Sequence, residues 1–261
     1  MERFQIKIAD HVIKINGKRS ELLGVLRDKY RAFLYDEVGD IDLFLNIEGG
    51  YGSPFTNNNV KIYSDNWKTM YQRADYLIEV EQDYKTAKIS AHDELALKHA
   101  LMNLYSSFIL HYNWGLLIHS SCVIENGKAH IFAGNSGAGK STAAKLSKPR
   151  DLLADEATIV KVDEDKISVY DSPFRSELES TKEEVPCQLG YIHLLNQSLT
   201  NERISLTKAQ AIMELTDKVF YWCHTPEEAK RIFQLLTKLV ETIPVDNLHF
   251  QKNNTFWELI S

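Results

Sequence analysis

The stretch of this sequence with the clearest chemistry runs from Gly134 to Ser141 and reads GNSGAGKS. It fits the pattern G-x-x-x-x-G-K-[ST] of a phosphate-binding loop at every fixed position. Glycines let backbone N–H groups turn toward a phosphate without a Cβ in the way, and the lysine adds a positive charge. The serine hydroxyl after the lysine is a ligand for Mg²⁺. The residues expected to bind ATP are Gly134, Asn135, Ser136, Gly137, Ala138, Gly139, Lys140, Ser141 and Thr142.

The segments on either side of this loop have the character that the motif requires. Residues 131–133 (Ile-Phe-Ala) are typical of a strand that enters the loop, and residues 142–147 of a helix that leaves it. A helix that begins there directs its positive N-terminal end at the phosphate oxygens. A glycine-rich turn that matches by chance has no reason to show this order of strand, loop and helix.

Two carboxylates follow the loop after a short interval. Residues 152–154 (Leu-Leu-Ala) predict a strand that ends in Asp155 and Glu156, and Asp155 lies 15 residues after Lys140 (155 − 140). Such a carboxylate can hold Mg²⁺ through water or take a proton from an attacking hydroxyl. The alternative is a solvated strand end, but the upstream loop favours function. We expect Asp155 to be catalytic and Glu156 to be a metal ligand.

Three further polar residues are weaker candidates. His119 ends an apolar segment just before the loop. A lone histidine in a strand is more often a hydrogen-bonded core residue, yet its place beside the phosphate loop favours a catalytic role. Arg175 and Glu177 lie on a turn after a predicted strand, from which they can reach the metal or the phosphates. Glu177 is the candidate metal ligand, and ordinary surface charges are the equal alternative for both.

The first 85 residues are expected to form a smaller β-rich region. Polar and apolar residues alternate there with the period of two that half-buried strands show, and Asn16-Gly17 is typical of a turn. The predicted strands cover residues 4–8, 12–15 and 41–47. The aromatic residues of this region are compatible with binding a peptide or a partner, although a small β core is the preferred interpretation.

Residues 86–261 are expected to form an α/β domain that carries the loop. Apolar residues at three- and four-residue spacings predict a long helix from about residue 91 to 112. Asn126-Gly127 is a strong hairpin signal, and Thr225-Pro226-Glu227-Glu228 is typical of a helix N-terminus. Further strands are predicted at residues 116–124, 129–133, 152–154, 158–162, 167–170, 189–195 and 245–250, and a further helix at 208–217.

Composition narrows the class of protein. The 261 residues include 30 Lys and Arg against 36 Asp and Glu, a formal charge of −6, which argues against a nucleic-acid partner. No stretch approaches the roughly 18 apolar residues that cross a bilayer, and the first residues lack the apolar core of a signal peptide. We therefore expect a cytoplasmic protein with no membrane partner. Three widely spaced cysteines without a C-x-x-C pair argue against a disulfide framework or a zinc site.

The order of these pieces resembles the HPr kinase/phosphorylase family, in the superfamily that includes ATP-dependent phosphoenolpyruvate carboxykinase. The resemblance rests on the histidine-bearing strand at 117–121, the loop, and the short gap to residues 153–156. It covers roughly residues 110 to 261. It implies an HPr kinase-like P-loop core with a mixed β-sheet and flanking helices, preceded by the β-rich region.

The resemblance also implies roles for individual residues. Lys140 and Ser141 would hold phosphate and metal, and Asp155 would deprotonate a substrate hydroxyl. His119 would lie near the reacting phosphoryl group, and Glu177 would bind the metal. The sequence departs from true HPr kinases, which usually carry Asp-Ser-Gly in the loop, Asp-Asp after the strand and a Gly-rich C-terminal signature. These departures point away from HPr itself as the substrate. Relatives with this shortened architecture look like kinases of peptide-modification systems, including lasso-peptide maturation, in which a peptide serine is phosphorylated.

The leading hypothesis is an ATP- and Mg²⁺-dependent kinase that transfers the γ-phosphate to a hydroxyl, most simply that of a serine in a peptide or protein. The first alternative is a non-catalytic nucleotide-binding regulatory module, and the acidic pair speaks against it. The second is a small-molecule kinase or a carboxykinase-like enzyme, for which no additional Arg and Lys cluster is evident. An oligomer is possible, because the sequence does not determine the oligomeric state.

Overall fold

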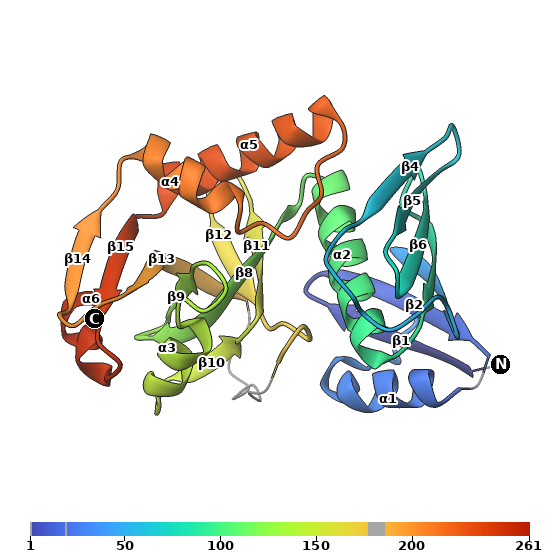
Figure 1. Cartoon of the computed structure of the whole chain (residues 1–261), viewed down its shortest axis with the longest axis horizontal. Helices are drawn as coiled ribbons and strands as arrows, with labels where there is room; N and C mark the ends of the chain where they lie inside the picture. Colours follow the sequence, from blue (N-terminus) through green and yellow to red (C-terminus); the bar gives the residue numbers. More distant parts are fainter. Residues whose placement is uncertain (1, 19, 177–185) are drawn as a thin grey trace. The chain divides into compact units, whose positions relative to one another are not determined.

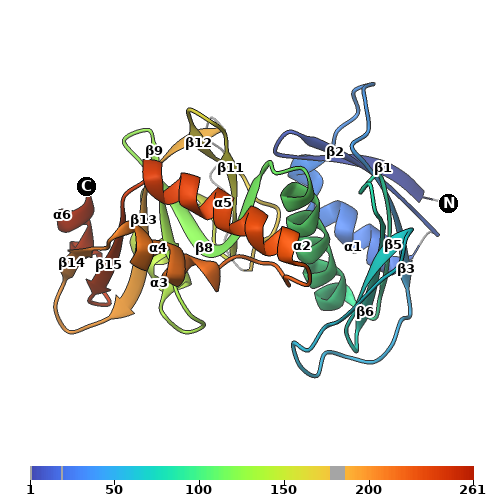
Figure 2. The same cartoon turned by 90° about the horizontal axis from the view of Figure 1, so that it is seen from above.

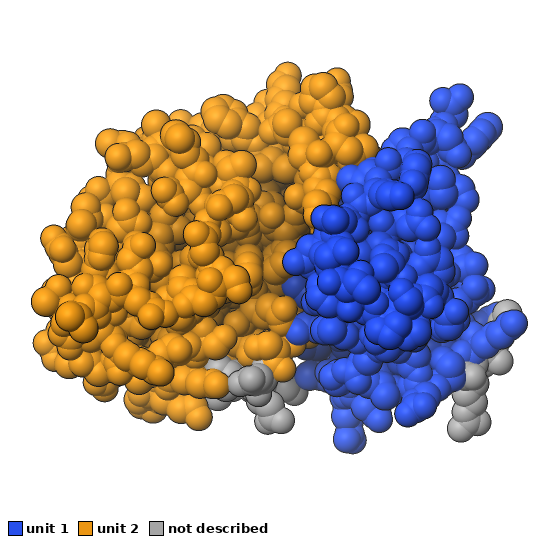
Figure 3. Space-filling view, in the orientation of Figure 1, with its two compact units in different colours: residues 1–108 blue, residues 109–261 orange. Residues whose placement is uncertain are grey.

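The computed structural model describes residues 2–18, 20–176 and 186–261 and is mixed α/β. The chain divides into two compact units, Met1–Phe108 and Ile109–Ser261 (Figure 3). This division differs from the boundary at residues 85/86 that the sequence suggested. The reason is helix α2 (Glu94–His111), whose Tyr105 hydroxyl donates to the Ile8 carbonyl at 3.1 Å and thereby ties most of the helix to the first sheet.

The first unit is built on one sheet (Figure 1). Its described strands lie in the order β1-β2-β3-β7-β6-β5-β4, with β2/β3 and β3/β7 parallel and the other pairs antiparallel. The strands are β1 (Glu2–Ile8), β2 (His11–Gly17), β3 (Leu43–Gly49), β4 (Lys61–Ser64), β5 (Lys68–Gln72), β6 (Tyr76–Glu81) and β7 (Thr86–Ala91). Besides α2, this unit has helix α1 (Glu21–Lys29) and a 3-10 turn, η1 (Arg31–Phe33).

The prediction of a turn at Asn16-Gly17 is wrong. The β1/β2 hairpin turns instead after Ile8, where Ala9 has a φ of +52°. Strand β2 continues through Gly17, and a Cβ at Gly17 would lie 2.6 Å from the Ile47 carbonyl oxygen. This glycine therefore serves close packing between parallel strands rather than a turn.

The second unit contains a larger sheet that closes on itself. Its described strands run β10-β8-β11-β12-β13-β15-β14, and β9 pairs with both β8 and β13, so β8, β11, β12, β13 and β9 form a ring. The strands are β8 (Gly115–Glu125), β9 (Lys128–Ala133), β10 (Asp151–Ala154), β11 (Ala157–Val162), β12 (Ile167–Tyr170), β13 (Cys187–Gln197), β14 (Glu202–Ser205) and β15 (Val245–Phe250). The strands predicted in this region are confirmed, and β14 was missed.

Helices cover both faces of this sheet (Figures 1 and 2). One apolar cluster joins the sheet to α4 (Lys208–Thr216) and α5 (Pro226–Thr242), and another joins it to α3 (Lys140–Leu146) and α6 (Trp257–Ile260), which follows the 3-10 turn η2 (Asn254–Phe256). Successive strand residues serve opposite faces: Ile131 belongs to the first cluster and Phe132 to the second. Strand β9 is therefore packed on both of its faces just before the loop.

Helix α5 follows from its sequence. The predicted N-terminus is confirmed: Thr225 and Glu228 form a capping box, and Pro226 is the first helical residue. Its buried residues recur at three- and four-residue spacings and pack on the sheet; they are Ile232, Leu235, Leu236, Leu239 and Val240. No helix among the described residues is long and apolar enough to cross a membrane.

The hairpin between β8 and β9 delivers the chain to the loop. Asn126 and Gly127 both have positive φ, +51° and +73°, as a tight two-residue hairpin requires. The hairpin predicted at Asn126-Gly127 is therefore confirmed. Cys122, Cys187 and Cys223, all within the described residues, form no disulfide.

A row of polar side chains, linked by hydrogen bonds, crosses the sheet from β9, the strand that enters the loop, to β14. His130 on β9 lies 3.2 Å (Nδ1 to Nε2) from His193 on β13, whose Nδ1 is 2.8 Å from an Asp246 carboxylate oxygen on β15. Arg203 on β14 donates to the other Asp246 oxygen at 2.7 Å. Burial, and then the nearby positive charge of His193, Arg150 and Arg203, lowers the pKa of His130 to about 3.

We predict that acid destabilises the protein partly through His130. Because the pKa is about 3 in the folded state and about 6.5 when unfolded, its contribution is complete above pH 6.5 and is lost as pH falls toward 3, by up to about 1.4 kcal/mol per pH unit. His130→Gln, which cannot titrate, should show a shallower loss of unfolding free energy between pH 7 and pH 5. Urea unfolding at each pH measures this, and equal slopes for variant and wild type would contradict it.

Candidate nucleotide-binding and catalytic site

The expected strand, loop and helix are present in order. Strand β9 ends at Ala133, and α3 begins at Lys140, two residues earlier than the sequence suggested. Gly137 and Gly139 have φ of +80° and +106°, a region that side chains other than glycine rarely adopt. A Cβ at Gly139 would lie 2.7 Å from Cζ of Phe250. The loop conformation thus depends on glycine at these two positions.

The side chain of Lys140, the first residue of α3, folds back onto the loop that precedes it. This side chain is largely buried, and its ammonium donates to the carbonyl oxygens of Gly134 at 2.9 Å and Asn135 at 3.0 Å. Burial lowers the pKa of Lys140, and the nearby positive charge of Lys218 lowers it further. A desolvated ammonium held in this way is a strong site for an anion, because little water screens it.

Neighbouring strands hold the loop through two side chains that the sequence analysis missed. The Ser121 hydroxyl on β8 donates to the Lys140 carbonyl at 2.9 Å, which fixes the start of α3. The Gln197 amide at the end of β13 donates to the Gly137 carbonyl at 2.7 Å. Neither residue belongs to the phosphate-binding loop motif, and nothing in the sequence indicates that their side chains contact the loop.

Asp155 lies directly after β10, and its side chain is only 2% exposed. Ser176 satisfies both of its oxygens: the backbone N–H donates to Oδ1 at 2.9 Å, and the hydroxyl donates to Oδ2 at 2.8 Å. The carboxylate is therefore oriented by the turn that contains Ser176. Hydrogen bonds of this kind offset the cost of burying a charged group.

Arg175 holds that turn in place. Its guanidinium donates to the carbonyl oxygens of Leu153 at 3.0 Å and Ser172 at 2.7 Å, and it pairs with Asp171. These contacts give Arg175 a role in positioning the turn, and the phosphate or metal contact that the sequence suggested stays a prediction. Glu177, the predicted metal ligand next to this turn, lies outside the described residues.

One pocket of about 380 Å³ brings the loop and the carboxylates together. Ser176 and Gln197 line it in addition to the expected residues. The expected residues that line it are His119, Ser136, Gly137, Gly139, Lys140, Ser141, Thr142, Asp155 and Glu156. Gly134, Asn135 and Ala138 belong to the loop without being part of this lining. The described residues contain no group of three or more His, Cys, Asp and Glu side chains that could hold a metal ion.

His119 enters this pocket as a neutral ring. Burial, and then the positive charges of Lys140 and Lys218, lowers its pKa to about 4. The ring lies beside Phe220, with 5.1 Å between ring centroids. At neutral pH His119 can therefore offer a hydrogen bond but no charge.

Lys218 is a second buried cation that the sequence analysis missed. Its side chain is almost fully buried, and its ammonium donates to Oδ1 of Asn135 at 2.7 Å and to Asp217 at 2.6 Å. The backbone N–H of His119 donates to the Lys218 carbonyl at 2.7 Å, which fixes this segment along β8. A single lysine far downstream of the loop carries no motif, so sequence spacing could not have found it.

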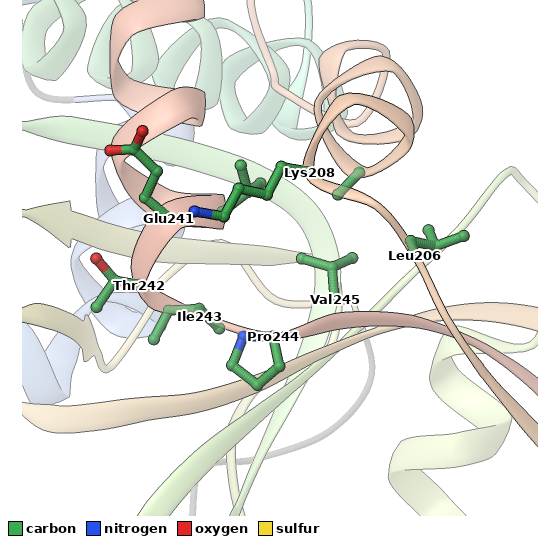
Figure 4. Close-up of a pocket in the computed structure, with 9 residues that line it drawn as sticks. Leu206, Lys208, Glu241, Thr242, Ile243, Pro244 and Val245 are labelled. Atoms are coloured by element: carbon green, nitrogen blue, oxygen red, sulfur yellow. The ribbon is translucent and has the colours of Figure 1, made fainter.

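A second pocket of about 230 Å³ lies between α4, α5 and the start of β15. Figure 4 shows aliphatic side chains such as Leu206, Ile243 and Val245 around it, with the Lys208 side chain extending toward the end of α5, where Glu241 lies. None of the residues predicted to bind nucleotide or metal lines it. The candidate site is therefore the pocket at the loop.

Comparison with known families identifies the chain. Residues 83–261 match the family described as SynChlorMet cassette protein ScmC. The match covers more than half of the chain, so the chain belongs to this family. No curated protein matches the sequence.

We predict that Gly139→Ala damages the loop more than Gly137→Ala. Both changes force a side chain into positive φ, which costs roughly 1–2 kcal/mol. Only Gly139 meets a neighbour, Phe250, while open space surrounds a Cβ at Gly137. The clash adds about 1–3 kcal/mol to the loss of unfolding free energy. Urea unfolding of both variants tests this, and equal losses would contradict the close contact with Phe250.

We also predict that Lys218→Met raises the pKa of His119 toward its ordinary value, because a nearby positive charge is removed. The remaining burial and Lys140 should keep the pKa below that of an exposed histidine. NMR titration of the His119 ring protons measures the shift. Lys208→Met, at the second pocket, is the matched control and should leave His119 unchanged. An unaltered His119 pKa in Lys218→Met would show that the two groups do not interact.

Proposed function

We propose that this member of the ScmC family is an ATP- and Mg²⁺-dependent phosphotransferase that moves the γ-phosphate of ATP to a hydroxyl, that of a serine in a peptide or protein. One observation carries the proposal: the phosphate-binding loop and the buried carboxylate of Asp155 line the same pocket. A phosphate donor and a group able to accept a proton are the two requirements of hydroxyl phosphorylation.

The residues of the pocket fit a polyphosphate. Gly137 and Gly139 leave the loop backbone without side chains at two residues of positive φ, and α3 starts immediately after Gly139. Backbone N–H groups in a loop of this kind can face a bound phosphate. Lys140 and Lys218 bring two buried ammonium groups to the loop. Two cations beside a loop of amide donors suit the several negative charges of a triphosphate better than a neutral ligand.

The same pocket offers ligands suited to Mg²⁺. The Ser141 hydroxyl and the Glu156 carboxylate both line it. Mg²⁺ prefers oxygen ligands and is usually bound by one or two protein groups together with phosphates and water. Bound there, Mg²⁺ would neutralise charge on the phosphates. Glu177 stays a prediction as a further ligand.

Asp155 is the group we assign as general base. It is buried and held in a fixed orientation by the Ser176 amide, so it can receive the proton of an acceptor hydroxyl without reorganising. His119 is neutral at physiological pH and can donate a hydrogen bond to a phosphoryl oxygen. Lys140 and Lys218 would stabilise the negative charge that the transferred group carries.

The arrangement supports an HPr kinase-like core in particular. The histidine strand β8, the loop and the short gap to β10 are the features on which the sequence resemblance rests, and they are neighbours in the fold. The resemblance favours a peptide or protein serine as acceptor. The loop and the residues after β10 differ from those of true HPr kinases, which points away from HPr as the substrate. A non-catalytic nucleotide module has no need of a buried carboxylate beside its phosphate loop. A small-molecule kinase stays the alternative that acceptor assays decide.

We predict that Lys140→Met and Asp155→Asn separate binding from transfer. Loss of the loop ammonium should weaken ATP binding by at least about tenfold, because a charge-assisted contact to phosphate is removed. Asp155→Asn should keep ATP affinity within a few-fold and lower transfer by about 10²–10⁴, the usual contribution of a general base. Calorimetry with ATP and Mg²⁺ measures binding, and labelled-phosphate transfer to serine peptides and to small alcohols measures chemistry.

Three outcomes would change this assignment. Wild-type protein that is folded but binds no adenine nucleotide would remove the proposed function altogether. Transfer at the wild-type rate by Asp155→Asn would remove Asp155 as the base. Transfer to small alcohols but never to peptides would shift the proposal to the small-molecule kinase.

A further inference from the structure

A serine of the chain itself lies where an acceptor hydroxyl should lie. Ser176 is exposed and lines the pocket with the loop, and its hydroxyl donates to Oδ2 of Asp155 at 2.8 Å. A hydroxyl that is to be phosphorylated must face the phosphate donor and hand its proton to the base. Ser176 is hydrogen-bonded to the residue that we assign as that base.

The turn that carries Ser176 is fixed firmly to the sheet. Phe174 is fully buried, and its N–H donates to the hydroxyl of the equally buried Ser172 at 3.2 Å. Arg175 reaches back to the Leu153 carbonyl, two residues before Asp155. An exposed serine is thus placed next to the carboxylate by one buried aromatic ring and one bound guanidinium. Its position is a property of the fold rather than of a freely rotating surface residue.

We propose that Ser176 is an autophosphorylation site, modified within its own chain by the activity proposed above, on which this inference rests. The Ser176 oxygen attacks the γ-phosphorus of ATP, a new O–P bond forms, and the bond between the γ-phosphorus and the bridging oxygen of ADP breaks. The hydroxyl proton passes to Asp155. The products are phosphoserine at 176 and ADP, so atoms and charge balance without another reactant.

The modification has a direct consequence for the pocket. A phosphoserine carries a charge of about −1.5 to −2 at neutral pH. Next to the Asp155 carboxylate this charge is repelled, while Lys140 and Lys218 attract it toward the loop. The phosphate on Ser176 therefore competes with the phosphates of ATP and removes the hydroxyl bond to Asp155. The modified chain should bind ATP several-fold more weakly than the unmodified chain.

The test uses the full chain with γ-labelled ATP and Mg²⁺ and no added acceptor. We expect incorporation that approaches one phosphate per chain, located on Ser176 by peptide mass spectrometry. The rate constant should not depend on protein concentration, because donor and acceptor belong to one chain. Ser176→Ala should lower incorporation by more than tenfold yet still bind ATP in calorimetry, and Ser176→Thr should retain part of it. Ser205→Ala, at an exposed serine on β14, is the matched control and should behave as wild type.

Other outcomes separate this inference from the proposed function. If the protein phosphorylates an added peptide while Ser176 stays unmodified, the inference fails and the function stands. Phosphate on another residue, equal labelling of Ser176→Ala, or a rate that rises in proportion to protein concentration would also overturn modification within the chain. If the folded chain binds no ATP, both proposals fall together.

Discussion

Strand β8 is the constraint on which the candidate site depends, because three successive residues, 119–121, bind the backbone of Lys218, Glu156 and Lys140. The N–H of His119 binds the backbone of Lys218 on one edge of the strand, and the N–H of the next residue binds the Glu156 carbonyl on the other edge. The third residue fixes the Lys140 carbonyl through its hydroxyl. The β8/β9 pairing sets where Gly134 begins the loop. A shift of register here would move the loop, the carboxylates and the second lysine apart.

The electrostatics of the pocket follow from that geometry. Burial lowers the pKa values of Lys140 and His119, and positive charge lowers them further: Lys218 acts on Lys140, and both lysines act on His119. The loop carbonyls, Asn135 and Asp217 hold these ammonium groups with hydrogen bonds. A bound polyphosphate would relieve the repulsion, because its charge is opposite to that of both lysines. This relief of repulsion is the electrostatic reason for which we propose an anionic ligand at the loop.

The sequence predicted the local features of the second unit well. A two-residue hairpin, a capping box and a glycine-rich loop each depend on a few adjacent residues, so their patterns are readable, and Asn126-Gly127 and Thr225 behaved as expected. Contacts between residues that are distant in the sequence could not be predicted from it. Gly17 looks like a turn residue until its parallel neighbour strand is known, and the chain division follows from helix packing rather than from composition. Lys218 meets the loop only because β8 pairs with its segment, and no spacing rule encodes that contact.

In the proposed reaction, the contact between Asp155 and Ser176 would also constrain how an external acceptor binds. A carboxylate that is 2% exposed requires hydrogen bonds, and the Ser176 amide and hydroxyl supply them. An incoming hydroxyl can replace the hydroxyl of Ser176 one for one, since the exchange of equivalent hydrogen bonds costs little free energy. The amide bond to Oδ1 can remain and keep the carboxylate oriented. In the proposed reaction, internal and external hydroxyls would then be alternative occupants of one position, so Ser176, which stabilises the buried carboxylate, would also compete with the substrate.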